Sequence, residues 1–216
     1  MQQIFQNRNM AGCQLAETLT PYKGNKDTIV LALPRGGVPV AYEMSKILDL
    51  PLDIILVRKL GAPEHEELAI GAIASGGETV LNKAIVERLN LSDDDIARVI
   101  KREKRELERR MRMYKGNRPQ VDFRAKKIIL VDDGLATGAT MLAAIYAVKQ
   151  QSPSKVIVAV PVVTKEALLR IRANVDDIVY LTSPDPFKAV GCWYREFTQL
   201  TDIEVIESLK KAWCNK

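Results

Sequence analysis

The sequence has 216 residues, of which 32 are Lys or Arg and 27 are Asp or Glu, so its formal net charge is +5. Hydrophobic residues make up 47% and charged residues 27%, a balance that is typical of a globular protein and excludes intrinsic disorder. The single histidine, His65, and three widely spaced cysteines exclude His-rich zinc centres and disulfide scaffolds, and they favour a reduced, cytoplasmic environment.

Short apolar strands alternate with helical patterns along the chain. Strands that are apolar on both faces are typical of parallel sheets covered by helices, so the alternation predicts an α/β fold. Two more helices are expected over 9–19 and 201–213. No apolar run approaches the ~20 residues that span a bilayer, and we expect a soluble protein without a membrane segment. The strands are expected over 28–33, 52–57, 127–131, 155–163 and 178–181, and the core helices over 38–48, 139–150 and 165–172.

The middle of the chain departs from this alternation. Gly76-Gly77 predicts a β-hairpin between 68–75 and 78–81. Ser92 is expected to cap a helix that ends at Gly116, and its length of about 24 residues would span ~36 Å. Such a helix is long for a crossover, so we expect a single domain over 1–216 with an insertion or flap at about 60–120.

Segment 98–118 is strongly basic: it holds ten Lys or Arg residues against three glutamates. Three interpretations stay open. The helix face is solvated and supported by pairs such as Glu106–Arg110, it is a dimer arm that docks on an acidic surface, or it binds the phosphates of a nucleic acid. We favour the first two interpretations over nucleic-acid binding.

The strongest chemical signal lies at 128–140, where a buried strand leads directly to Asp132 and Asp133. A loop of small and hydroxyl residues follows and opens a helix. Ligands of open α/β sheets bind at strand carboxyl ends, and the free N–H groups of a helix start attract phosphate. Paired carboxylates suit sugar hydroxyls or hydrated Mg²⁺. The alternative is a generic strand-to-helix turn.

A second signal is Arg35-Gly36-Gly37, which follows the first strand. Two glycines let backbone N–H groups approach a ligand closely, and Arg35 offers a planar fork for phosphate oxygens. Alone, this motif fits a plain turn. Arg58 and Lys59 follow the next expected strand, where they are either solvated charges or further anion ligands.

Residues 128–140 resemble the motif of type I phosphoribosyltransferases that binds 5-phosphoribosyl 1-pyrophosphate (PRPP). Gly134 departs from the usual aliphatic residue, and we expect a slightly looser turn there. The resemblance implies that Asp132 and Asp133 contact the ribose hydroxyls and Mg²⁺, directly or through water. It implies that the 5′-phosphate is bound by the loop residues Ala136, Thr137, Gly138, Ala139 and Thr140.

The same resemblance assigns further roles by position. It implies that Arg35, Gly36 and Gly37 bind the pyrophosphate, together with Arg58 and Lys59. Residues 62–67 match the family's mobile catalytic loop, in which His65, Glu66 or Glu67 would act in proton transfer. We select Glu67 for this role and expect His65 to be an ordinary exposed residue.

The sequence says less about the acceptor. Six-oxopurine enzymes of the family that this chain resembles carry an Asp at the first position of the phosphate loop, which is Ala136 in this chain. Residues 136–140 are instead close to the pattern of the adenine enzymes. A hood over about 183–216 would cover the base, with Phe187 or Trp193 stacked on it; core packing is the alternative for these aromatics. Residues 68–72 and 189–194 resemble a less-characterised subfamily whose acceptor is not established.

Together these observations predict an Mg²⁺-dependent phosphoribosyltransferase that uses PRPP, ribosylates a nucleobase or related nitrogen acceptor and releases pyrophosphate. An adenine-like acceptor is favoured over six-oxopurines, and a homodimer is expected. The alternative is a PRPP-sensing regulator that binds nucleic acid through the basic helix.

Overall fold

The computed structural model describes residues 5–63, 65–119 and 121–214, with the side chain of Glu67 outside that description. Its centre is a five-stranded sheet in the order β2-β1-β6-β7-β8, in which every neighbouring pair is parallel. This arrangement confirms the α/β fold predicted from the alternation of strands and helices. The strands are β1 (Thr28–Ala32), β2 (Leu52–Ile54), β6 (Lys127–Val131), β7 (Lys155–Val162) and β8 (Asp177–Thr182).

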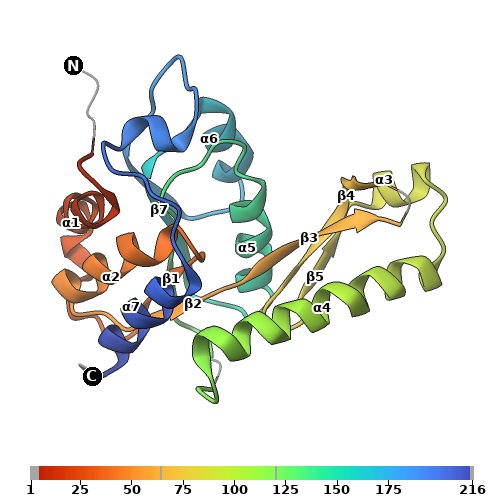
Figure 1. Ribbon diagram of the computed structural model, residues 1–216, viewed down its shortest axis with the longest axis horizontal. Helices are drawn as coiled ribbons and strands as arrows, with labels where there is room; N and C mark the ends of the chain where they lie inside the picture. Colours follow the sequence, from red (N-terminus) through yellow and green to blue (C-terminus); the bar gives the residue numbers. More distant parts are fainter. Residues whose placement is uncertain (1–4, 64, 120, 215–216) are drawn as a thin grey trace.

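Helices cover both faces of this sheet, which explains the unbroken apolar runs of its central strands (Figure 1). Alternate residues of β1 and β6 point to opposite faces. One face packs against α1 (Arg8–Thr18), α2 (Gly37–Leu48) and α7 (Asp202–Cys214). The other face packs against α5 (Ala139–Lys149) and α6 (Lys165–Arg172).

An arm, defined as residues 57–115, projects from this core (Figure 1). It consists of an antiparallel sheet, β3 (Val57–Ala62), β4 (His65–Ala74) and β5 (Thr79–Leu81), followed by the short helix α3 (Lys83–Arg88) and by α4 (Asp93–Lys115). The hairpin predicted at Gly76-Gly77 is confirmed. The strand expected over 52–57 is wrong in extent, since β2 ends at Ile54 and Val57 already belongs to the second sheet.

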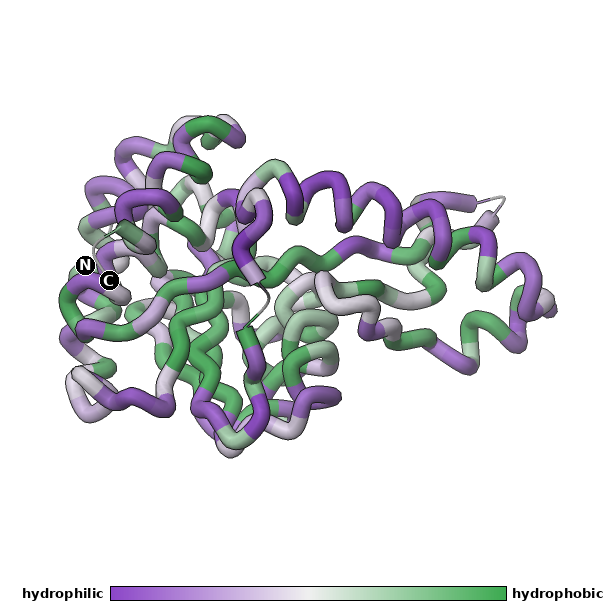
Figure 2. Tube along the Cα trace, turned by 90° about the horizontal axis from the view of Figure 1, so that it is seen from below, coloured by the Kyte–Doolittle hydropathy of each residue, from purple (hydrophilic) through white to green (hydrophobic). Residues whose placement is uncertain are grey.

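Helix α4 lies along the arm and has the boundaries that its sequence predicts. The Ser92 hydroxyl accepts a hydrogen bond from the Asp95 N–H, while the Asp95 carboxylate accepts one from the Ser92 N–H. Gly116, at φ 57°, ends the helix. Its buried apolar face joins the same core cluster as β1 and α2, whereas the rest of the helix is hydrophilic (Figure 2).

The chain segment after β8 forms a strap, defined as residues 183–201, that contains the 3-10 turn η2 (Val190–Trp193). Phe5 pairs with Tyr194 of the strap, and its N–H donates to the Trp193 carbonyl at 2.8 Å. Helix α7 then packs on α2 through buried residues such as Val205 and Leu209. A short 3-10 turn, η1 (Thr20–Tyr22), follows α1. Within the described residues, no helix is long and apolar enough to cross a membrane.

Candidate active site

Asp132 and Asp133 come directly after the last residue of β6, at the carboxyl edge of the parallel sheet. The Asp133 N–H donates a hydrogen bond to Asp132 Oδ1 at 2.9 Å. Burial raises the pKa of the Asp132 carboxyl well above its ordinary value, and the nearby charge of Asp133 raises it further. A ligand that donates hydrogen bonds or carries positive charge would therefore be stabilised beside Asp132.

The Gly36-Gly37 turn after β1 lies directly against this acid pair. A Cβ atom at Gly36 would lie 2.1 Å from Asp133 Oδ2, and one at Gly37 would lie 2.5 Å from the Val131 carbonyl oxygen. Only glycine permits such an approach. Because β1 and β6 are parallel neighbours, the two sequence-predicted motifs lie side by side at one edge of the sheet, as their positions in the chain implied.

Arg8 of α1 forms an ion pair with Asp133. Its Nε lies 2.8 Å from Asp133 Oδ2, and both side chains are nearly buried, at 10% and 13% exposure. Arg8 Nη1 donates to the Thr198 carbonyl at 3.0 Å, and the guanidinium carbon lies 3.8 Å from the centre of the Phe197 ring. Burial raises the pKa of Asp133, whereas the hydrogen bond and charge of Arg8 oppose that rise. Sequence patterns missed Arg8, because an isolated arginine in an N-terminal helix carries no motif.

Tyr194 of the strap also binds the acid pair. Its hydroxyl donates to the Asp133 carbonyl oxygen at 2.5 Å, and its ring packs between Phe5 and Phe197, with centroid separations of 5.3 and 5.1 Å. Burial, and secondarily the charge of Asp133, raises the pKa of this phenol above its ordinary value. Tyr194 therefore stays a neutral hydrogen-bond donor at physiological pH.

The loop after the acid pair leads into α5. Gly138 has φ 71° and precedes the helix without supplying a side-chain cap, while the Ala139 N–H donates a long hydrogen bond of 3.5 Å to the Thr137 hydroxyl. Thr137, Ala139 and Thr140 are exposed, and Ala136, also exposed, accepts a hydrogen bond at its carbonyl from the Thr164 hydroxyl at 2.6 Å. The first N–H groups of α5 thus open beside small and hydroxyl residues, which is the arrangement that accommodates phosphate.

Gly134 does not loosen this turn, so the expectation of a looser turn is wrong. A Cβ atom there would lie 2.6 Å from Val190 Cγ1 and 2.7 Å from Val162 Cγ1. Val190 of the strap fills the space beside the backbone, and the missing side chain allows the strap to pack closely against the loop.

Arg35 lies at the edge of the glycine turn, after a cis Pro34–Arg35 peptide bond. Its Nη1 is 3.8 Å from Asp202 Oδ1 of α7, and the side chain is 39% exposed. The Tyr114 hydroxyl donates to the same Asp202 oxygen at 2.5 Å. Burial and this hydrogen bond raise the pKa of Tyr114 to about 12. Arg35 therefore adjoins the glycine turn in sequence, but its side chain is directed toward α7.

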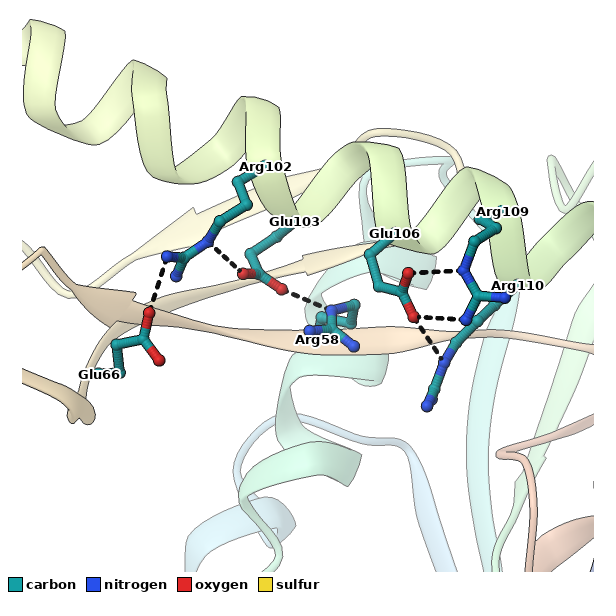
Figure 3. Close-up of polar contacts among 7 residues, drawn as sticks. All are labelled: Arg58, Glu66, Arg102, Glu103, Glu106, Arg109 and Arg110. Carbon is teal, nitrogen blue, oxygen red and sulfur yellow. Dashed lines mark hydrogen bonds and ion pairs between the residues drawn. The ribbon is translucent and has the colours of Figure 1, made fainter.

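Arg58 and Lys59 lie on β3, outside the central sheet. Arg58 Nε donates to Glu103 Oε2 at 2.5 Å, which directs this side chain toward α4 (Figure 3). The structure thus places Arg58 in the arm's own ion-pair network and not beside the acid pair.

Of the segment 62–67, the described residues 62, 63 and 65–67 lie at the outer end of the arm, and 65–67 belong to β4 (Figure 1). His65 is exposed and lines a cavity with Leu89, Asn90, Leu91 and Asp95, while Glu66 Oε1 lies 2.7 Å from Arg102 Nη1. The structure therefore does not bring these described residues to Asp132 and Asp133. The side chain of Glu67 lies outside the described residues.

The aromatic candidates for base stacking pack with the strap. Trp193 is 6% exposed and belongs to a buried cluster with Phe5, Ala11 and Val162. Phe187 is partly buried, and its ring centre lies 6.3 Å from that of Trp193.

Comparison with known proteins assigns the family. Residues 2–194 match the model of the phosphoribosyl transferase domain. The chain belongs to the phosphoribosyl transferase domain family. A Mycobacterium tuberculosis protein with the name "Putative phosphoribosyl transferase Rv0571c" is 41% identical over 209 residues, 97% of this chain and 47% of that protein. The chain thus spans about half the length of this curated relative.

Two further comparisons cover most of the domain. The crystal structure of TT1426 from Thermus thermophilus is 41% identical and superposes with a TM-score of 0.85, covering 96% of this chain and 98% of that one. A ribose-phosphate pyrophosphokinase of Marinomonas sp. is 27% identical over 185 residues, 82% of this chain and 56% of that protein. These findings confirm the family and the fold that the resemblance implied.

Proposed function

We propose that this domain is an Mg²⁺-dependent phosphoribosyltransferase that transfers the phosphoribosyl group of PRPP to a nitrogen acceptor and releases pyrophosphate. The observation that carries the proposal is the contact of the Gly36-Gly37 turn with Asp132 and Asp133, beside the start of α5, where Gly138 supplies no side-chain cap. Two anion-binding backbone segments then flank one pair of carboxylates, which matches a ribose that carries phosphate at both ends. The names of the relatives, which refer to phosphoribosyl transfer and ribose phosphate, agree with this ligand.

In this proposal each segment contacts one part of PRPP. The N–H groups of 138–140 and the hydroxyls of Thr137 and Thr140 bind the 5′-phosphate. Asp132 accepts hydrogen bonds from the ribose hydroxyls, which favours its ionised form despite burial. The N–H groups of Gly36 and Gly37 bind the pyrophosphate, and Arg35 joins them by leaving its 3.8 Å contact with Asp202.

The residues present fit a magnesium ion that is bound mainly by the substrate. The described residues contain no group of three or more His, Cys, Asp or Glu side chains that could hold a metal by themselves. Mg²⁺ keeps several waters and is commonly held by one or two carboxylates plus phosphate oxygens, and Asp132 and Asp133 could supply those carboxylates. When bound, Mg²⁺ neutralises charge on the departing pyrophosphate.

The chemistry follows from positioning and electrostatics. The bond between C1 of the ribose and the pyrophosphate oxygen breaks, and the acceptor nitrogen forms the new bond to C1. Asp132 places negative charge near the ribosyl centre as it becomes cationic, while the backbone N–H groups hold both phosphate ends in place. We retain Glu67 as the proposed proton-transfer residue, with a homodimer as the proposed assembly.

An adenine-like acceptor is part of the proposal. Ala136 has no carboxylate to handle a proton of a six-oxopurine, and the Thr164 hydroxyl already binds its carbonyl. Phe187 is the proposed stacking residue because it is less buried than Trp193.

A screen of acceptors tests the proposal. Adenine, xanthine, orotate, uracil and small amines are each incubated with PRPP and Mg²⁺, and pyrophosphate release is measured. Release is expected with adenine or a related amine and is expected to be lost in Asp132→Asn/Asp133→Asn. Full activity in this double variant would contradict the assigned site, and release with hypoxanthine or xanthine alone would contradict the acceptor.

A further inference from the structure

A cavity of about 410 Å³ lies in the arm, away from the acid pair. It opens between the β4–β5 turn, residues 75–77, and the C-terminal half of α4. Gly76 and Gly77 have φ of 126° and 93° and are exposed, so these two positions present backbone and no side chains to the cavity. The volume lies within the range of small-molecule sites, about 300–1,000 Å³.

Several cations of α4 have ion-pair partners: Arg102 binds Glu66 and Glu103, while Arg109 and Arg110 share Glu106 (Figure 3). For four others the structure gives no ion-pair partner within the described residues: Lys101, Lys104, Arg105 and Arg112.

Two of these cations line the cavity. Lys104, Glu108 and Arg112 follow one another at intervals of four residues, so they share one face of the helix. The Lys104 Nζ lies 4.0 Å from where a Cβ atom of Gly77 would stand. Arg118 adds a third cation, with its guanidinium carbon 4.6 Å from the centre of the Trp213 ring. Glu108 is the single carboxylate among the lining residues.

The inner wall of the cavity is apolar and electrically neutral. Leu107, Met111 and Ala74 line it. Lys115 lies there too, but its Nζ is 2.6 Å from Asp53 Oδ2 and both side chains are only 3% exposed, so this charge is compensated. The cavity thus combines a cationic rim with an apolar wall.

We propose that this cavity binds a nucleotide, with phosphates at Lys104, Arg112 and Arg118 and the base against Leu107 and Met111. A small ligand is favoured over a nucleic acid because three cations converge on one cavity. An extended phosphate backbone would use Lys101 and Arg105 equally, and these two lie outside the cavity lining. The proposed site is separate from the PRPP site and does not depend on it.

Isothermal titration calorimetry of the full chain with ATP tests this site. We expect saturable binding that weakens at least tenfold in Lys104→Gln/Arg112→Gln, because charge-assisted hydrogen bonds are lost. The matched control Lys101→Gln/Arg105→Gln removes the same charge from the same helix outside the cavity and is expected to change the affinity less than twofold. Asp132→Asn, which alters the PRPP site and leaves the Arg8–Asp133 ion pair in place, is expected to bind ATP as the wild type does.

Other outcomes would overturn the proposal. Equal losses in the two cation variants would show diffuse electrostatic attraction without a site. If inorganic triphosphate bound as tightly as ATP, the apolar wall would contribute nothing to binding, and the proposed base contact would be wrong. Single-stranded RNA that binds more tightly than ATP and loses affinity equally in both variants would assign the helix to nucleic acid. Loss of ATP binding in Asp132→Asn would show that ATP binds at the PRPP site and not in this cavity.

Discussion

Arg8 and Asp133 form a nearly buried ion pair, with 2.8 Å between Nε and Oδ2, across 125 positions of sequence. The pair joins α1 to the carboxyl end of β6, and the same guanidinium binds the Thr198 carbonyl of the strap. Through Arg8, Asp133 therefore links α1 and the strap to the proposed site. Asp132 forms no ion pair with an arginine within the described residues, and it is the carboxylate that we assign to the ribose.

Replacing Arg8 tests this division of roles. Arg8→Gln leaves the Asp133 carboxylate buried without its cation, and removal of one partner of such a pair costs about 3–5 kcal/mol, less here because both side chains keep some exposure. Urea denaturation is expected to show a lower free energy of unfolding. Arg8→Lys, which keeps the charge, is expected to lose less. Equal stability of Arg8→Gln and the wild type would show that Asp133 does not need this partner.

The raised pKa of Asp132 predicts a pH dependence of stability. Burial raises its folded pKa above the unfolded value of about 3.9, so its contribution is fully favourable below that value and is lost as the pH rises through the folded pKa. Asp132→Asn should therefore gain stability relative to the wild type as the pH rises above about 4. Denaturation series in metal-free buffer measure the difference. Asp27→Asn, at an exposed carboxyl whose pKa is lowered by Lys126, should show no such gain, and a pH-independent difference for Asp132→Asn would contradict the prediction.

Gly134 and Val190 give a test of the strap. Gly134→Ala forces a Cβ atom to within 2.6 Å of Val190 Cγ1, and overpacking of this kind costs about 1–3 kcal/mol. Val190→Ala in the same chain removes one of the two clashing groups, so the double variant should recover part of the loss. A thermal denaturation cycle of the four proteins measures the coupling. Additive effects would show that strap and loop are not in contact.

Glu103 and Glu106 provide a matched pair on α4. Glu103 is buried and binds Arg58 and Arg102, whereas Glu106 is partly exposed, at 31%, and binds Arg109 and Arg110. Glu103→Gln is expected to lower the free energy of unfolding by about 1–3 kcal/mol, because it removes the buried negative charge and leaves one acceptor oxygen for two arginines. Glu106→Gln should have a much smaller effect, as solvent screens such pairs. Similar values for both variants would contradict this burial argument.

The central sheet and the acid pair could be predicted because their signals are local. A run such as Ile128 to Val131 reports a strand covered on both faces, and the chemistry follows in the next residues. The break between β2 and β3 could not be predicted, since the unbroken apolar run from Ile54 to Val57 gives no sign that the chain changes sheets. The Ile55 N–H bonds the Ala32 carbonyl, while the Leu56 N–H bonds the Ser75 hydroxyl, and these partners are distant in sequence.

The contacts of Arg8, Tyr194 and Arg58 escaped prediction for the same reason. Each side chain is fixed by a partner at least 45 positions away: Asp133 for the first two and Glu103 for the third. No periodicity or spacing encodes such contacts. The segment 62–67 matches the family's catalytic loop by its place in the chain. Its place in space depends on the lengths of β3 and β4, which that match does not predict.

Binding of PRPP tests the central claim most directly, because it requires no knowledge of the acceptor. Calorimetric titration of the full chain with PRPP and Mg²⁺ is expected to give saturable binding to the wild type. Binding should be retained in Lys104→Gln/Arg112→Gln and lost in Asp132→Asn, which keeps the Arg8–Asp133 ion pair. Unchanged PRPP affinity in Asp132→Asn would contradict the assignment of the carboxyl end of β6 as the phosphoribosyl site.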